Sequence, residues 1–334
     1  MRVENMDRLT RRGFLIGASG VALAVATGCG SGDAQPSGST GATLGDKYGR
    51  VVVGDDPRRV VSVGYNDHDA ILALGVVPVG VFDWYGNQPD ATWPWAHDRL
   101  GGAHPAVIGT AGTGLDIEAV AATDPDLVLG TYSGLTQNEH DTLSALAPTV
   151  GQPAEFADFG VPWQIQTRTI GKALGRSAQA DDLVNAVQQQ FTDVAAAHPE
   201  FAGRTVIVGA LKGPGQFGVY GPEDPKVRFF TELGFVNPPV TQQITGTNFA
   251  PISTEQLTLA DTDLLVWYAG GGFGDKLRAE LAATPVYAGL PVVEGGRVII
   301  LDDAAAEAMT WSTVLSLPYA LNDIPPRIAP LLGG

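Results

Sequence analysis

A segment that occurs twice constrains the fold of this chain more than any other feature. Residues 116–129 and 253–266 each combine helical apolar spacing, an aspartate and a short apolar run, and they lie 137 positions apart. Two more pairs occur in the same order: residues 59–64 with 204–209, and the Leu-Gly pairs at 74–75 and 233–234. Three matches in one order predict two similar lobes. The two Leu-Gly pairs lie farther apart in the chain than residues 59–64 and 204–209 do. About 14 additional residues are therefore expected around 214–225 of the second lobe.

Each lobe is predicted to hold a parallel-type sheet, which makes the fold class α/β. Residues 59–64 form a short apolar run closed by glycine, which is typical of a buried strand. A helix is expected to begin after an N-cap at Asp116 and to end near Asp124. Strands are also expected over 76–81, 107–108 and 126–130. Strands that alternate with helices through short connections indicate parallel pairing.

The domain organisation follows from this pattern. The lobes are expected over residues 44–161 and 199–334, joined by a helical region over 162–198. Apolar residues of that region recur at helical spacing in two stretches, which start near 163 and 178. A long helical connector is stiff, so we expect a cleft whose walls move little.

The first 28 residues are similar to a bacterial export signal. An arginine pair at 11–12 precedes an apolar run over 14–26, which is too short to span a membrane. The pair resembles a twin-arginine signal, and Ala26-Thr-Gly-Cys29 resembles the lipobox of bacterial lipoproteins, in which the cysteine is lipidated. Residues 29–43 have the composition of a flexible tether. These features predict an extracytoplasmic protein that is lipid-anchored to the cell membrane through Cys29.

Charge excludes some partners and favours others. The chain has 20 Lys+Arg against 36 Asp+Glu and a net charge of −16, so nucleic acid is not expected as a partner. Its single cysteine excludes an internal disulfide. The acidic surface favours a neutral or cationic ligand, such as a ferric hydroxamate, unless the charge inside the cleft overrides it.

Aromatic residues gather where the predicted strands end, and ligands of open parallel sheets bind at that edge. Such side chains suit a large, partly apolar ligand. The candidates in the first lobe are Tyr65, Trp84, Tyr85 and Tyr132, and those in the second are Lys212, Phe217, Tyr220, Arg228, Trp267, Tyr268 and Trp311. Lys212 and Arg228 could meet carboxylate or hydroxamate oxygens. For each candidate a role in the core or on the surface is the alternative, and Trp93 and Trp95 are expected to pack beneath a loop.

Several enzyme classes lack their motifs here. The chain has no G-x-S-x-G and no H-E-x-x-H sequence. The glycine-rich run at 270–274 lacks the Lys-Ser/Thr of a phosphate loop, and the five histidines form no evident metal-ligand set. No catalytic residues are therefore expected, with an exported enzyme kept as the less favoured alternative.

Four segments taken in order resemble the iron-siderophore and vitamin B12 class of ABC-transporter substrate-binding proteins. They are residues 59–64, 74–80, 116–129 and 170–175, and residues 83–89 and 93–96 resemble its actinobacterial iron-siderophore branch. The resemblance covers about residues 46–333. It implies a class III periplasmic-binding-protein fold with a rigid long helix between the lobes. It also implies capture of a ferric siderophore for an ABC importer by a monomeric protein without a cofactor or protein metal site. Haem and cobalamin are the alternative ligands.

The resemblance also suggests how the partner would dock. Glu118 and Glu255 hold equivalent places in the two repeats. In the resembled class one exposed glutamate of each lobe docks onto arginines of the two permease subunits. Favourable contact with a helix dipole is the alternative role for both residues.

Overall fold

The first lobe is built around a six-stranded sheet of strand order β6-β5-β4-β3-β7-β8. The computed structural model describes residues 41–85, 87–244 and 249–333, so the predicted signal and Cys29 lie outside the described residues. The strands are β3 (Val60–Ser62), β4 (Gly80–Asp83), β5 (Ala106–Thr110), β6 (Gly114–Leu115), β7 (Leu127–Leu129) and β8 (Thr149–Val150). All pairs are parallel except β5 with β6, as the alternation of strands and helices predicts.

Short helices connect these strands. They are α1 (Asp67–Ala73), α2 (Pro94–His97), α3 (Ile117–Ala122) and α4 (Gln137–Ser144), with the 3-10 turns η1 (Pro89–Ala91) and η2 (Asp98–Leu100). Asp116 caps α3 as expected, because its carboxylate accepts a hydrogen bond from the Ala119 amide at 3.0 Å. The buried residues Val60, Ile71, Leu127 and Ile170 belong to one apolar cluster that packs the sheet on α1 and on the connecting region.

The second lobe holds a five-stranded sheet of order β11-β10-β9-β12-β13. Its strands are β9 (Val206–Gly213), β10 (Gln216–Tyr220), β11 (Phe249–Ile252), β12 (Leu264–Tyr268) and β13 (Val298–Leu301). The strands β9, β12 and β13 are parallel, whereas β10 pairs antiparallel with β9 and β11. The additional residues expected around 214–225 include β10, which pairs antiparallel with β9, whereas β4 of the first sheet pairs parallel with β3.

Helices surround this second sheet and complete the chain. They are η3 (Pro199–Phe201), α7 (Pro225–Glu232), α8 (Pro239–Gln242), η4 (Glu255–Ala260), α9 (Gly274–Ala282), α10 (Pro285–Ala288), α11 (Pro291–Glu294), α12 (Ala304–Trp311) and α13 (Ser316–Leu332). Among the residues described, no helix combines the length and apolar character that a membrane crossing requires.

The repeated aspartates have the same structural role in both lobes. The carboxylate of Asp126 accepts hydrogen bonds from the amides of Arg58 and Arg59, at 2.7 and 2.8 Å. Asp263 accepts one from the amide of Thr205 at 2.8 Å. Each aspartate therefore fixes the start of the neighbouring parallel strand. The helical parts that precede the two aspartates differ. The helix of the second repeat is a 3-10 helix, and its N-cap is Thr254 rather than Ser253.

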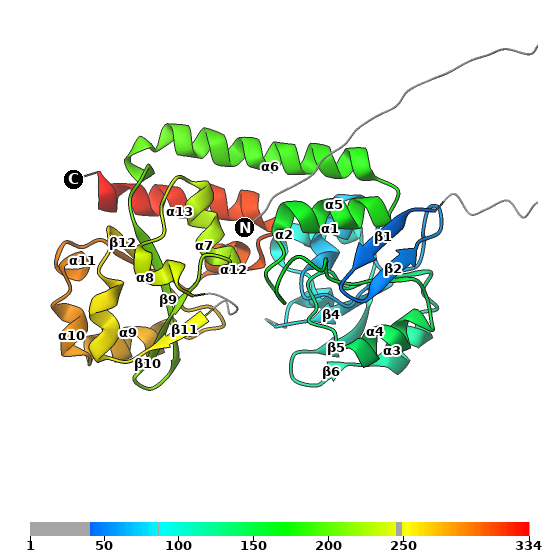
Figure 1. The fold of residues 1–334 in the computed structure, drawn as a ribbon, viewed down its shortest axis with the longest axis horizontal. Helices are drawn as coiled ribbons and strands as arrows, with labels where there is room; N and C mark the ends of the chain where they lie inside the picture. The colour runs from blue at the N-terminus through cyan, green and yellow to red at the C-terminus, as the bar shows by residue number, and fades with distance from the viewer. Residues whose placement is uncertain (1–40, 86, 245–248, 334) are drawn as a thin grey trace, which may run out of the picture. The chain divides into compact units, whose positions relative to one another are not determined.

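Two long helices join the lobes. The helices α5 (Trp163–Ala173) and α6 (Ser177–Ala197) form the predicted connector, and Figure 1 shows α6 running along both lobes with α13 beside it. Ala180 of α6 packs into the core of the first lobe, whereas Val187 and Phe191 pack into that of the second. One helix anchored in both cores is the arrangement that a rigid connection requires.

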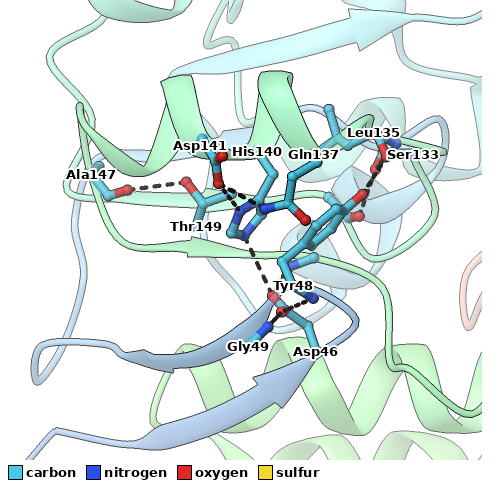
Figure 2. Close-up of polar contacts among 12 residues, drawn as sticks. Asp46, Tyr48, Gly49, Ser133, Leu135, Gln137, His140, Asp141, Ala147 and Thr149 are labelled. Atoms are coloured by element: carbon cyan, nitrogen blue, oxygen red, sulfur yellow. Dashed lines mark hydrogen bonds and ion pairs between the residues drawn. The ribbon is translucent and has the colours of Figure 1, made fainter.

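The hairpin where the described chain begins is held on the first lobe by the carboxylate of Asp46 and by the ring of Tyr48. The hairpin consists of β1 (Thr43–Asp46) and β2 (Gly49–Val52). Asp46 accepts hydrogen bonds from the amides of Tyr48 and Gly49, both at 2.9 Å (Figure 2). Its carboxylate also accepts one from the amide of Gly151 at 2.7 Å. The ring of Tyr48 stacks on His140 of α4 with their centroids 4.1 Å apart. The first described strands are therefore firmly held on the first lobe.

Candidate ligand-binding cleft

A cavity of about 520 Å³ lies between the two lobes, at the carboxyl ends of their parallel strands. Residues of the first lobe that line it are Tyr65, Trp84, Tyr85, Ala111, Tyr132 and Phe159; those of the second are Lys212, Tyr220, Asp224, Lys226, Tyr268, Gly270, Gly271, Phe273 and Thr310. Seven of the eleven ligand-binding candidates, namely Tyr65, Trp84, Tyr85, Tyr132, Lys212, Tyr220 and Tyr268, thus meet in one cavity. Its volume is that of a site for a small molecule.

The wall from the first lobe is an aromatic stack. The ring centroid of Tyr65 lies 5.0 Å from that of Trp84 and 5.1 Å from that of Phe159, with the ring pairs nearly parallel. Phe159 also meets the edge of Tyr132 at 5.4 Å. Phe159 was not among the predicted residues. It reaches the stack with a left-handed backbone (φ 60°) and packs over Gly134, where a Cβ atom would lie 2.6 Å from its ring.

A hydrogen-bonded carboxylate joins the two lobes across the cavity. Glu307 on α12 is buried and accepts hydrogen bonds from the hydroxyls of Tyr85 and Tyr268 and from the amide of Gly271. The distances are 3.1 Å to Tyr268 and 2.8 Å to Gly271. Tyr85 belongs to the first lobe and Tyr268 to the second, so this carboxylate holds a tyrosine from each wall. Burial and the nearby Glu307 carboxylate raise the pKa of Tyr268 to about 12, so its phenol stays protonated at neutral pH.

A buried ion pair lies in the wall from the second lobe. The Nζ of Lys226 is 3.0 Å from the carboxylate of Asp224, and both side chains are less than 10% exposed. The ammonium also lies over the rings of Tyr220 and Tyr268, at 4.0 and 5.3 Å from their centroids. Burial alone would lower the pKa of Lys226, but Asp224 and the two tyrosines raise it above its usual range. Neither member of the pair was singled out from the sequence.

Two predicted contacts, Phe217 and Trp267, are core residues instead. Their exposed fractions are 1% and 0%, and they pack together with ring centroids 5.6 Å apart in the cluster that also holds Leu277 of α9. Neighbouring side chains of a strand point to opposite faces. Trp267 therefore faces α9, while Tyr268 faces the cavity. Their prediction as ligand contacts is wrong, because only one of the two faces of a strand is turned toward the cavity and these two side chains lie on the other face.

Trp311 and Arg228 lie beneath the cavity rather than in its lining. Trp311 is 2% exposed and meets the edges of Trp84 and Trp93 at 5.7 and 6.0 Å. Arg228 pairs with Glu223, and it donates a hydrogen bond to the Gly160 carbonyl at 2.8 Å. Both residues therefore support the walls in this structure. Trp93 stacks on Trp95 with centroids 5.1 Å apart, in the packing arrangement that the sequence indicated.

A buried polar network underneath ties the first lobe to the C-terminal segment. The side chain of Asn66 donates to the Trp311 carbonyl at 2.7 Å, and Gln166 donates to Asn66 at 2.7 Å. Asp69 accepts from the Thr313 hydroxyl at 2.5 Å and from the Trp95 indole at 2.8 Å. Burial raises the pKa of Asp69 to about 6. Such cross-links favour a cleft with little freedom to open.

The two glutamates considered for docking are both on the surface. Glu118 lies in the first turn of α3 and Glu255 begins η4, and both are exposed. Hydrogen bonds from its own backbone and from Ser253 lower the pKa of Glu255. Both carboxylates therefore lie at the surface of the part of the chain that the structure describes. Within the same residues, no group of three or more His, Cys, Asp or Glu side chains is placed to hold a metal ion.

Two α/β lobes on a rigid helical link, with an aromatic cleft between them, define a two-lobed solute-binding protein. The sequence profile of the periplasmic binding protein family matches residues 60–305, and the chain belongs to that family. Proteins of this family act outside the cytoplasm.

Named relatives span most of the chain. It is 23% identical over 288 residues to the Fe(3+)-citrate-binding protein YfmC of Bacillus subtilis, which covers 84% of this chain and 86% of the relative. It is 25% identical over 289 residues to the probable siderophore-binding lipoprotein YfiY of the same organism, which covers 80% and 82%. A crystal structure of a periplasmic solute binding protein from Mycobacterium smegmatis superposes with a TM-score of 0.77 and 31% identity, over 88% of this chain and 99% of that one.

Proposed function

We propose that this protein captures a ferric siderophore in the cleft between its lobes and delivers it to an ABC importer. The observation that carries the proposal is the cavity of about 520 Å³ with a stacked aromatic wall on one side and lysines on the other. Such a wall buries a large, partly apolar chelate with little loss of side-chain freedom. The printed names of the two Bacillus subtilis relatives, an Fe(3+)-citrate-binding protein and a probable siderophore-binding lipoprotein, support the same class of ligand.

The cleft tyrosines support a preformed chelate over direct ligation of iron. Burial raises the pKa of Tyr65, Tyr85 and Tyr132 as well as that of Tyr268. A tyrosine binds iron, as in some haem proteins, through an oxygen that has lost its proton. Tyr85 and Tyr268 already donate their hydroxyl protons to Glu307, so Tyr65 and Tyr132 are the phenols that can donate hydrogen bonds to oxygens of a chelator that already holds the iron.

Quenching of tryptophan fluorescence tests the proposed ligand class, because Trp84 lines the cavity. The mature protein would be titrated with ferric hydroxamates, ferric citrate, ferric catecholates, haem and cobalamin. We expect saturable quenching by at least one ferric siderophore. Saturation by haem or cobalamin alone would assign the site to that ligand instead. No response to any of them, together with hydrolase activity, would favour the exported enzyme.

The aromatic wall should carry much of the affinity. Tyr65→Ala and Trp84→Ala each remove a ring of the stack that lines the cavity, so we expect a loss of about 1–3 kcal/mol in binding free energy. Isothermal titration with the chelate identified above measures it. Tyr319→Ala is the matched control, since Tyr319 is 43% exposed and lies outside the cavity. Unchanged affinity in both wall variants would place the ligand elsewhere.

We propose that the protein is exported folded and tethered through lipidated Cys29. Cys29→Ala should leave the protein unprocessed or release it into the medium, and replacing both Arg11 and Arg12 by lysine should block export. Fractionation of cells followed by immunoblotting measures both. Membrane association of the Cys29 variant at the wild-type level would contradict the proposed anchor.

We also propose that Glu118 and Glu255 dock the loaded protein onto a dimeric permease. One exposed carboxylate in each lobe would fix the orientation of docking, because charged pairs across an interface determine register more than affinity. The positions in the first turn of α3 and at the start of η4 support this role, since neither side chain is committed to an ion pair with a described residue.

A further inference from the structure

A second cavity adjoins the cleft on the side of the second lobe. It measures about 310 Å³ and is lined by Ala210, Leu211, Lys212, Gly213, Tyr220, Tyr268, Ala269, Gly270, Phe273, Lys276 and Leu277. Lys212, Tyr220, Tyr268, Gly270 and Phe273 line both cavities, so the two spaces meet along these residues. We call the second cavity the basic annex, because the charged residues among those described in its lining are two lysines, Lys212 and Lys276.

Within the part of the chain that the structure describes, the lysines of the basic annex form no ion pair. Neither Lys212 nor Lys276 has a carboxylate within 4.0 Å among the residues described. Their ammonium groups lie over aromatic rings instead, that of Lys212 at 4.5 Å from the centroid of Phe249 and that of Lys276 at 5.9 Å from that of Phe273. Partial burial and the positive charge of Lys226 lower the pKa of Lys212. The negative charge of Asp224 raises it, but by less. An anion in the annex would relieve this unfavourable environment.

The charge in the cleft is opposite to the charge of the whole chain. Among the described residues, the linings of the two cavities together contain Lys212, Lys226 and Lys276 against a single carboxylate, that of Asp224. The nearby carboxylate of Glu307 already accepts two phenol hydroxyls and a backbone amide. A chain with a net charge of −16 thus concentrates positive charge at its ligand site. Such local charge attracts an anionic ligand and determines which ligand is accepted.

We infer that the basic annex binds an anionic arm of the iron chelate, so that the preferred ligand is a ferric chelate with net negative charge. This inference rests on the proposed function and specifies its ligand class. It reverses the expectation of a neutral or cationic hydroxamate, which net charge alone favoured. The aromatic wall would contact the apolar part of the chelate, while Lys212 and Lys276 meet its anionic oxygens. Carboxylates and catecholates share that chemistry.

Affinity measurements with three probes test the charge preference. The mature protein would be titrated with ferric citrate prepared in excess citrate, with an anionic ferric tris-catecholate and with a neutral ferric trihydroxamate. We expect at least one anionic probe to bind more tightly than the neutral one, and its affinity to fall as salt is added. The two anionic probes distinguish a carboxylate arm from a catecholate arm.

Substitution of the two lysines tests whether the preference for an anionic chelate arises in the basic annex. Lys212→Gln and Lys276→Gln should each weaken binding of the preferred anionic probe by about tenfold, and the double variant by about a hundredfold. Binding of the neutral probe should change by less than about threefold. Lys172→Gln is the matched control, because Lys172 is an exposed lysine of α5 outside both cavities. Circular dichroism would confirm that each variant is folded.

Two results would overturn the inference while leaving the proposed function intact. One is tightest binding of the neutral trihydroxamate by the wild-type protein. The other is anionic binding that survives in the folded double variant. Failure of every ferric chelate to bind the wild-type protein would instead overturn the proposed function itself.

Discussion

Asp224→Ala should lower the free energy of unfolding by about 3–5 kcal/mol, because it leaves Lys226 buried without its counter-charge. In the wild-type protein the two groups lie 3.0 Å apart with side chains that are 8% and 6% exposed. The carboxylate of Asp224 also accepts a hydrogen bond from the Lys226 amide at the start of α7. Unfolding in urea, followed by circular dichroism, measures the change.

Two further variants separate the ion pair from the loss of the cap. Asp224→Asn with Lys226→Met removes both charges and keeps a capping side chain, so its stability should lie much closer to that of the wild type. Asp181→Ala breaks the exposed pair with Arg168, whose side chains are 54% and 39% exposed, and should cost less than about 1 kcal/mol. Equal losses in Asp224→Ala and Asp181→Ala would contradict a buried, energetically coupled pair.

The pH dependence of this pair has a definite sign. Asp224 and the nearby tyrosines outweigh burial and raise the pKa of Lys226 in the folded protein. A raised pKa of a cation contributes stability that is complete below the unfolded pKa of about 10.4 and is lost as pH rises through the folded value. The contribution of Lys226 should therefore stay constant across neutral pH and decline only above about pH 10. The same unfolding measurements at pH 7–11 test it.

Glu118→Arg or Glu255→Arg should abolish uptake of the ligand and leave its affinity for the binding protein unchanged. Both residues are exposed, and neither lines the cleft, so a charge reversal at either position does not touch the ligand. If each docks onto a permease arginine, the reversal places two like charges against each other, which costs several kcal/mol. Uptake of a radioactive iron chelate by cells that depend on this protein measures the first part, and titration of the purified variants measures the second.

A control variant is needed to separate the loss of a docking residue from a general effect of reversing a surface charge. Glu294→Arg reverses an exposed glutamate of α11 that lies outside both repeats, and uptake should stay at the wild-type level. Normal uptake by Glu118→Arg and Glu255→Arg would show that the two residues serve only their helices. A loss of uptake in all three variants would indicate a general effect of charge rather than docking at two points.

Much of the fold was predictable because it follows from local patterns. The apolar runs closed by glycine form β3 and β9, and the repeated aspartates hold the start of each strand. The rule that ligands bind at strand ends located the cavity through Tyr65 and Tyr132. The rule does not say which face of a strand is turned toward the cavity. It therefore selected Trp267 together with Tyr268, although only the second faces the cavity.

The missed residues depend on contacts that no local pattern reports. Glu307 lies in an alanine-rich helix and meets Tyr85, which is 222 positions earlier in the chain. Lys226 resembles a surface residue in the first turn of a helix, and it is buried only because α7 begins at the cleft. Phe159 joins the stack through a left-handed backbone in a loop. Each of these positions is determined by the way the lobes come together.

An iron anomalous difference map from a crystal of the protein with its ferric chelate tests the central claim most directly. We predict one iron peak inside the cavity lined by Tyr65, Trp84 and Tyr268, with every bond to the iron made by the chelator. Anionic oxygens of the chelate should face Lys212 and Lys276. An iron peak outside this cavity, or an iron bound directly by a tyrosine oxygen of the protein, would contradict capture of a preformed chelate in the cleft.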